Sequence, residues 1–197
     1  MKNKRFLIFN DSHSICGLEF ADALSNQDIN IEHLDKKLDK LTYNEINESI
    51  AHAVNDKKFF DVIIVYLSNY YLNDEGLDQQ TVWHEALNCR IRNLLFIIQA
   101  ANKLIHNRKC KIIVLFEKTN TKANKTISSI FTDSLTELIK SSPNEASKNL
   151  VSIHMIEFSN SYCDELKGHK NILANRISNS LEFVIGNLNS GSITTLG

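Results

Sequence analysis

The chain has 197 residues, 43% of them hydrophobic and 23% charged, so it is long enough to bury one sizeable core. Lys and Arg number 22 against 23 Asp and Glu, and a net charge of -1 gives no overall field that would attract nucleic acid or an anionic membrane. One proline and six glycines are too few for a loop-rich or all-β fold. We therefore expect a single domain over residues 1–197.

Signals for membrane insertion, secretion and metal binding are weak. The longest apolar stretches, such as residues 94–98, fall far short of the roughly 18 residues that span a bilayer. Charged residues break up the amino terminus, which lacks the apolar core of a signal peptide. The four cysteines include no close pair, which is typical of reduced thiols. The sequence thus predicts a cytoplasmic protein with no membrane segment and no metal.

Apolar runs of strand length alternate with segments of helical period along the whole chain. The predicted strands are Arg5–Phe9, Ile29–Leu34, Val62–Leu67, Lys111–Phe116 and Leu150–Phe158. The predicted helices are Gly17–Ser25, Thr42–Lys57, Gln79–His106, Thr126–Ser141 and Asn171–Leu188. Three of the strands are almost continuously apolar, as strands buried on both faces are. This alternation predicts a three-layer α/β fold with a mostly parallel sheet of about five to six strands and helices on both faces.

The long helix predicted to end at His106 has more apolar surface than one sheet face covers. Over residues 91–106 the polar side chains fall on a narrow stripe, and most of the remaining circumference is apolar. An apolar arc wider than half the helix predicts a second packing partner, either the next helix or a partner subunit. The residues expected at such an interface are Ile91, Leu94, Leu95, Ile98 and Ile105 on this helix and Phe131 and Leu135 on the next.

Four segments along the chain match one family in order. They are the strand RFLIF with the turn from Asn10 to Gly17, the segment DVIIVYLS from Asp61, the segment Trp83–Lys111, and the ending LEFVIGNLNSGSITTLG. Together they resemble the short-chain dehydrogenase/reductase (SDR) family. There they correspond to the TGxxxGxG turn, the DxLVNNAG strand, a long helix with a basic turn, and a last helix leading into an S-x-x-I-T-G turn. The resemblance covers nearly the whole chain and implies a Rossmann-like fold.

The first turn departs from the family pattern at two of its three glycines. In SDR enzymes these glycines let the pyrophosphate of NAD(P) approach backbone N–H groups at a helix N-terminus. Here Asp11 stands at the first glycine, where its carboxylate repels a pyrophosphate, and Ile15 stands at the second, where its side chain fills the approach space. Only Gly17 is kept. The resemblance implies a degenerate turn, so we expect no cofactor; NAD(P) would bind only if the chain is a divergent enzyme.

The family's catalytic tyrosine and lysine have no counterpart either. In SDR enzymes the tyrosine of YxxxK is the general acid/base and the lysine activates it. The corresponding region, Lys118–Ser141, contains no tyrosine. Arg90 stands where the family's helix carries a catalytic asparagine, and Glu117 where a strand end carries the catalytic serine. We expect no catalytic residue, and we expect Arg90 and Glu117 to converge and pair, because an unpaired charge in a cleft is costly.

The chain is also short for the family. Only one helix is predicted between Ile29–Leu34 and Val62–Leu67, where the family has a further strand and helix, so one βα unit is expected to be missing on the adenosine side. The family also continues past the turn that ends this chain into one more strand. The expected fold is an SDR fold trimmed on both sides of its cleft.

Weaker patterns favour structural roles. His84 and Glu85 resemble the first half of a zinc-protease motif but lack the second histidine, and a solvated pair is the simpler interpretation. The basic residues between Lys103 and Lys111 more often complement a helix C-terminus than bind phosphate. Aromatic residues at positions 66, 70, 71 and 83 lie past a strand's carboxyl end, where α/β sheets bind ligands, although core packing is their more frequent role.

Three functions follow from these observations. The first is a catalytically inactive SDR-like protein that acts by association, as a homodimer or as a hetero-oligomer with an SDR paralogue, without nucleic acid, membrane or metal. The alternative is a divergent NAD(P)-dependent oxidoreductase that uses Glu117 or Tyr66 as its acid/base. The second alternative is a TIR-like signalling or NAD-cleaving domain. Residues 61–71 also resemble that family's strand and S-x-x-Y turn, with Glu85 as its carboxylate.

Overall fold

The computed structural model describes twelve parts of the chain: residues 4–10, 30–33, 38–55, 60–68, 78, 80–81, 84–105, 109–118, 125–146, 151–159, 170–187 and 191–196. The predicted helix Gly17–Ser25 lies outside these residues. So do the turn positions Asp11, Ile15 and Gly17, and the aromatic positions 70, 71 and 83.

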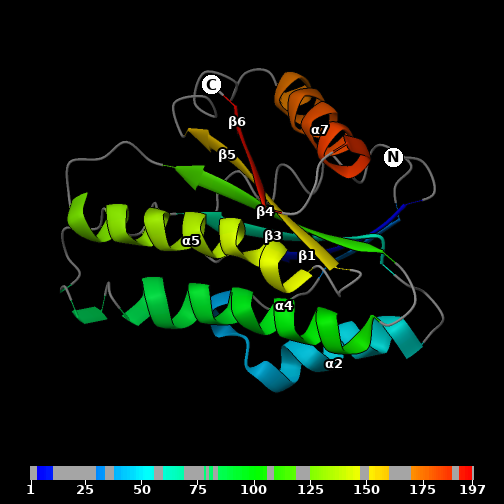
Figure 1. Ribbon diagram of the computed structural model, residues 1–197, viewed down its shortest axis with the longest axis horizontal. Coiled ribbons are helices and arrows are strands. Elements are labelled where there is room, and N and C mark those ends of the chain that lie inside the picture. Colours follow the sequence, from blue (N-terminus) through cyan, green and yellow to red (C-terminus); the bar gives the residue numbers. More distant parts are fainter. Residues whose placement is uncertain are drawn as a thin grey trace.

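One sheet of six strands forms the middle of the molecule (Figure 1). The strands are β1 (Arg5–Asn10), β2 (Asn30–His33), β3 (Val62–Ser68), β4 (Cys110–Lys118), β5 (Val151–Ser159) and β6 (Ser192–Leu196). Their order is β2-β1-β3-β4-β5-β6, and every neighbouring pair is parallel. All the carboxyl ends therefore meet at one edge of the sheet.

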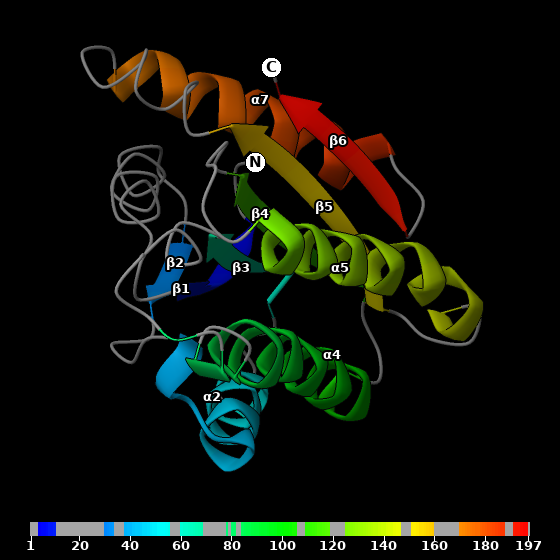
Figure 2. The ribbon, with the colours of Figure 1, turned by 90° about the vertical axis from the view of Figure 1, so that its left-hand side faces the viewer.

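The helices divide between the two faces of this sheet. The main helices are α2 (Tyr43–Asn55), α4 (Arg92–Leu104), α5 (Lys125–Ala146) and α7 (Lys170–Asn187), with a short 3-10 turn η1 (Leu38–Lys40) before α2. Figures 1 and 2 show α2, α4 and α5 on one face and α7 on the other. Of the described helices, none is long and apolar enough to cross a membrane. The predicted three-layer α/β architecture is confirmed.

Local sequence explains the best-defined elements. All seven residues of β3 are buried, as the continuous apolar run predicts for a central parallel strand. Helix α2 begins with a reciprocal cap. The Thr42 backbone N–H donates to Glu45 Oε2 at 2.8 Å, and the Glu45 N–H donates to Thr42 Oγ1 at 3.3 Å. The helix Thr42–Lys57 predicted from the apolar period agrees with α2 to within two residues at each end.

The predicted trimming of the sheet agrees with the structure at the β2 edge, whereas the structure differs from the prediction at the β6 edge. The described residues between β2 and β3 form only η1 and α2, and β2 lies at the edge beside β1, as a missing βα unit predicts. The ending SITTL was predicted as a turn, but the structure makes it β6, which pairs with β5 from His154↔Ser192 to Phe158↔Leu196. Its β-branched residues favour an extended strand, and Ile193 packs against the core.

The predicted helix Gln79–His106 is not uniform. Residues His84–Ile91 form the π-helix η3, which continues directly into α4. Wide π turns are rare and leave the backbone hydrogen bonds shifted by one residue. Asn93 then anchors the start of α4, because its buried amide donates to the Leu38 carbonyl at 2.6 Å and to the Leu41 carbonyl at 3.2 Å. The amphipathic period alone does not reveal this change of helix type.

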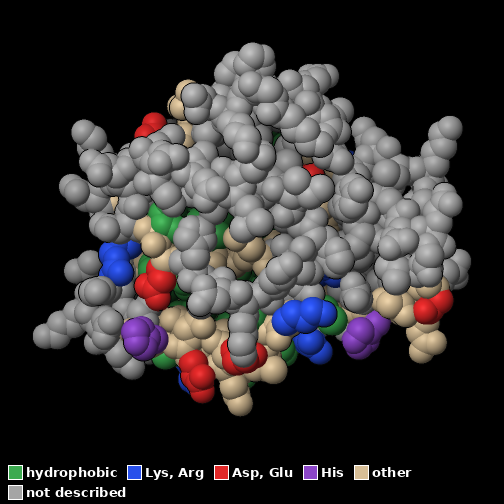
Figure 3. Space-filling view, turned by 180° about the vertical axis from the view of Figure 1, so that it is seen from behind, with side chains coloured by type: hydrophobic (Ala, Val, Ile, Leu, Met, Phe, Trp, Pro, Cys, Tyr) green, Lys and Arg blue, Asp and Glu red, His purple; other side chains and the backbone are tan. Residues whose placement is uncertain are grey.

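The structure places most of the residues expected at an interface in the core of the chain itself. The residues of that set that are buried in the core of the same chain are Leu94, Ile98, Ile105, Phe131 and Leu135. The arc's second packing partner is α2, whose Tyr43 ring meets the Phe96 ring edge-on with centroids 5.1 Å apart. Ile91 is partly buried against this core, and Leu95 is 37% exposed. Viewed from behind, the lower part of the molecule shows hydrophobic side chains only in small areas between charged and polar ones (Figure 3).

Candidate functional site

The candidate site lies at the carboxyl ends of the central strands. In open parallel sheets, ligands bind outside these ends at the point where the strand order reverses. Here that point lies between β1 and β3, because the chain moves outward to β2 and then returns to the other side of β1. Asn10 ends β1, Ser68 ends β3, and Glu117 lies one residue before the end of β4. The side chains at these strand ends therefore determine what this edge can bind.

A buried hydrogen bond joins β3 and β4 at this edge. The Tyr66 hydroxyl donates to Glu117 Oε2 at 2.9 Å, and the two residues are only 1% and 3% exposed. Strand alternation places both on the face that α7 covers, since Tyr66 packs in the same cluster as Leu115 and Phe158. The Phe158 ring meets the Tyr66 ring edge-on at 5.9 Å. The pair is packed into the protein rather than presented to solvent.

This arrangement determines what the two groups can do chemically. The phenol hydrogen of Tyr66 is already donated to a carboxylate, so it is not directed at a substrate oxygen. Removing it would leave two negative charges about 2.9 Å apart in a buried site, which is costly. The Tyr66–Glu117 pair therefore fills this part of the edge with a buried hydrogen bond.

Arg90 is the other residue that the resemblance predicts at a position where SDR enzymes carry a catalytic group. It lies in η3, is 0% exposed and is the largest fully buried side chain among the described residues. The expected ion pair between Arg90 and Glu117 stays a prediction. A buried guanidinium requires anionic or carbonyl partners, because its desolvation is otherwise uncompensated. The structure thus places Arg90 on η3 as a fully buried cation.

An ion pair lies on the opposite face of the same edge. Lys118 Nζ is 3.1 Å from Glu157 Oε1, and the two side chains are 43% and 17% exposed. The pair joins β4 to β5 at their carboxyl ends, since Phe116 and Glu157 are register partners. Because it is partly solvated, it contributes little to stability. It is nevertheless the most accessible charged pair at this edge for which the structure gives a contact.

A polar cluster around His154 of β5, which the sequence did not lead us to expect, lies farther from the carboxyl ends of the strands. The His154 ring is fully buried, with Nδ1 2.6 Å from Ser192 Oγ and Nε2 3.2 Å from Ser152 Oγ. Burial, and secondarily the charge of Lys111, lower the pKa of His154 to about 4. The imidazole is therefore neutral at pH 7 and links β5 to β6. The available signal was the pattern Ser-x-His, from Ser152 to His154, within the predicted strand Leu150–Phe158.

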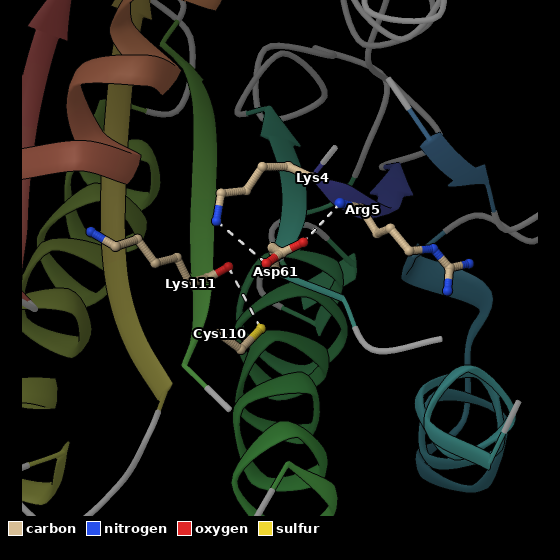
Figure 4. A network of polar contacts seen from close by, with 5 residues as sticks. All are labelled: Lys4, Arg5, Asp61, Cys110 and Lys111. Carbon is tan, nitrogen blue, oxygen red and sulfur yellow. Dashed lines mark hydrogen bonds and ion pairs between the residues drawn. The ribbon is translucent and has the colours of Figure 1, made fainter. Parts of the chain in front are cut away.

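A second network ties the amino ends of β1, β3 and β4 together (Figure 4). Asp61 accepts a hydrogen bond from the Arg5 backbone N–H at 3.0 Å. It also forms an ion pair with Lys4, whose Nζ lies 3.3 Å from Asp61 Oδ1. Burial, and then the charge of Asp61, raise the pKa of the Cys110 thiol to about 12, so this cysteine is unreactive. Lys111 donates to the Val184 carbonyl near the end of α7 at 2.8 Å. These groups hold the sheet together at the edge opposite the candidate site.

Metal-binding chemistry finds no support in the part of the chain that the structure describes. No three His, Cys, Asp or Glu side chains gather there as metal ligands would. His84, the first residue of the half-motif, is exposed. The side-chain position of Glu85 lies outside the description.

Comparisons with known proteins bear on the fold. No protein-family model matches the chain, and no curated protein does. Among solved structures, a short-chain dehydrogenase/reductase from Serratia marcescens matches with a TM-score of 0.70 and 11% identity, over 99% of this chain and 96% of that one. A short-chain dehydrogenase from Mycobacterium smegmatis matches at 0.67 and 14%, over 100% and 92%. A variant of ElxO with NADPH bound matches at 0.68 and 15%, over 99% and 97%. The chain therefore has an SDR-like Rossmann fold.

Proposed function

We infer, on the premise of this SDR-like fold, that the chain lacks the oxidoreductase chemistry of SDR enzymes and acts by associating with another protein. The observation that carries the inference is the buried hydrogen bond between Tyr66 and Glu117. It occupies the strand ends where the resemblance puts catalytic groups, and Glu117 stands at the position of the catalytic serine. A protein that keeps the fold but packs side chains into the position of the active site loses the oxidoreductase activity. It still has surfaces that can bind another protein.

The amino-acid sequence supports the same conclusion for the cofactor. Asp11 and Ile15 replace the two glycines that would let a pyrophosphate approach the backbone. We propose that neither NADH nor NADPH binds. The partner is a second copy of this chain or an SDR paralogue, because two proteins of one fold present related surfaces to each other.

One observation favours a rival function, a divergent NAD(P)-dependent oxidoreductase. Tyr66 and Glu117 are two ionisable groups joined by a hydrogen bond at the edge where α/β enzymes carry out chemistry. Their burial and the direction of the hydrogen bond argue against it, since a reductase tyrosine must donate to substrate. The two proposals differ in a simple property, because only the rival requires a bound nicotinamide cofactor.

Calorimetric titration with NADH and NADPH separates them. We expect no saturable heat at cofactor concentrations up to the millimolar range, with an NADPH-binding SDR enzyme titrated in parallel as the positive control. Saturable binding of either cofactor would overturn the proposed function and support the rival. Association is tested separately, by purification from the native source followed by native mass spectrometry. A strictly monomeric protein with no co-purifying partner would contradict it.

A further inference from the structure

Strand β6 is attached to the described sheet along one side. It ends the sheet beyond β5, and Figure 2 shows it at the margin of the layer. Four of its five residues are partly exposed and Thr195 is exposed, whereas all seven residues of β3 are buried. A strand with one neighbour and little buried surface can separate from the sheet at a lower free energy than the global unfolding of the chain requires. β6 is therefore an element that can open locally.

One buried imidazole joins the start of β6 to β5. The His154 ring is 0% exposed, with Nδ1 2.6 Å from Ser192 Oγ on β6 and Nε2 3.2 Å from Ser152 Oγ on β5. Next to this contact, the Gly191 N–H donates to the Ile153 carbonyl at 2.7 Å. A neutral imidazole has one N–H donor and one acceptor nitrogen, so the two hydroxyl groups satisfy both. The neutral ring thus fits between the strands while β6 is in place.

A lysine is the described charge that acts on this ring. Strand alternation puts His154 on the face of the sheet that α7 covers, together with Phe158. On the same face β4 carries Lys111, which is the register partner of Ser152 and donates to the Val184 carbonyl of α7. Burial, and then the charge of Lys111, lower the pKa of His154 to about 4. An imidazolium at this position lies buried beside a second positive charge.

The described carboxylates around the ring do not compensate for that charge. Glu117 is on this face of β4, but it lies four residues beyond the register partner of His154, about 13 Å along the strand. Strand alternation puts Glu157 on the opposite face of β5, and β6 carries no charged residue. On α7, Arg176 and Glu182 are exposed, so solvent screens their charges. Protonation therefore favours any state in which the ring reaches water.

We propose that the His154–Ser192 contact is an acid-sensitive switch, in which protonation of the imidazole releases β6 from β5 while the other five strands stay paired. The ring lies between the edge strand and its neighbour, so separation of β6 brings water to it. Of the residues of β6, Ile193 and Leu196 pack against the two cores, and both are only partly buried. Acid thus exposes the edge of β5 without global unfolding. The inference is independent of the proposed function, because it concerns a contact within one chain.

The size of the effect follows from proton linkage. In the released state the pKa of His154 returns toward its ordinary value of 6.5, so that state binds the proton more readily than the closed one. The equilibrium constant for opening is therefore nearly constant above about pH 7 and rises as the pH falls. Between pH 7 and pH 5 we expect it to rise about twentyfold.

Hydrogen exchange followed by mass spectrometry measures this opening in the full chain. Protection factors, taken relative to the exchange rate of an unstructured chain at each pH, are compared for peptides from β6 and β3 at low urea concentrations. Exchange in β6 should be insensitive to urea, as local opening is, whereas exchange in β3 should depend on urea, as global unfolding does. Between pH 7 and pH 5 the β6 protection factor should fall about twentyfold in the wild type. It should fall equally in the control His52→Gln, an exposed position on α2, and less than about threefold in His154→Gln.

Two results would overturn the switch. If β6 exchanges with the same urea dependence as β3 at both pH values, it opens only when the whole chain unfolds. If His154→Gln keeps the full pH response, another group is responsible. Ser192→Ala decides the matter should His154→Gln fail to fold, because it leaves the imidazole in place. Loss of the hydroxyl should lower the β6 protection factor about fivefold at pH 7, and unchanged protection would contradict the proposal.

Discussion

The Tyr66–Glu117 contact makes a specific prediction for single residues. Tyr66→Phe removes the hydroxyl, and the buried Glu117 carboxylate loses the hydrogen bond that this hydroxyl donates to it at 2.9 Å. Because an under-satisfied buried acceptor loses its compensation for desolvation, we expect the free energy of unfolding to fall by about 1–3 kcal/mol. Urea denaturation followed by far-UV circular dichroism measures the change. Tyr43→Phe, at a half-buried position on α2, is the control and should change stability by less than about 0.5 kcal/mol. Equal stability of Tyr66→Phe and the wild type would contradict the assignment.

His154 predicts a pH dependence. Its pKa is about 4 in the folded chain and about 6.5 when unfolded, so the unfolded chain binds the proton more readily. Above about pH 6.5 the imidazole is neutral in both states, so His154 does not change the free energy of unfolding. As the pH falls from about 6.5 toward 4, this free energy decreases, and below that pH the total loss levels off at about 3 kcal/mol. Lys111 is the charged group whose repulsion contributes to this shift.

The measurement is a comparison with His154→Gln, because carboxylates titrate over part of the same range. Urea unfolding at pH 7, 5.5 and 4.5 should show the wild type losing stability faster than the variant as the pH falls. The difference between the two proteins isolates the imidazole. Parallel pH profiles for the two proteins would show that His154 is not the responsible group.

Among the elements, α4 depends on one side chain for its position relative to η1. Asn93→Ala removes two hydrogen bonds, of 2.6 and 3.2 Å, and leaves the carbonyls of Leu38 and Leu41 buried without them. We expect a loss of about 1–3 kcal/mol in the free energy of unfolding, measured by urea denaturation. The matched control is Asn102→Ala on the same helix, since the buried Asn102 Oδ1 accepts no hydrogen bond. A control variant as destabilised as Asn93→Ala would refute this role for Asn93.

At the scale of the whole molecule, the described helices divide between the two faces of the sheet. Helices α2, α4 and α5 bury the larger hydrophobic core, and α7 covers the smaller one, which contains Tyr66. The Tyr66–Glu117 pair of the candidate site therefore lies on the face that α7 covers.

Much of this fold was predictable from local patterns. Continuous apolar runs predicted β3 and β4, a helical period predicted α2, and their alternation predicted the parallel sheet and its layers. The single helix expected between Ile29–Leu34 and Val62–Leu67 also predicted the missing βα unit, because predicted elements can be counted along the chain without knowing which residues contact each other. The replaced glycines and the tyrosine-free region 118–141 were likewise evident from the sequence alone.

Only the tertiary structure decided which groups meet. Tyr66 reaches Glu117 because β3 and β4 pair with Ser68 opposite Glu117, a register that neither strand encodes alone. The apolar arc of α4 is covered by α2 of the same chain, so residues expected at an interface are core residues instead. Residues 192–196 become a strand because β5 offers them an open edge. Periodicity is a property of neighbouring residues, whereas register, cover and edge pairing depend on residues far apart in the chain.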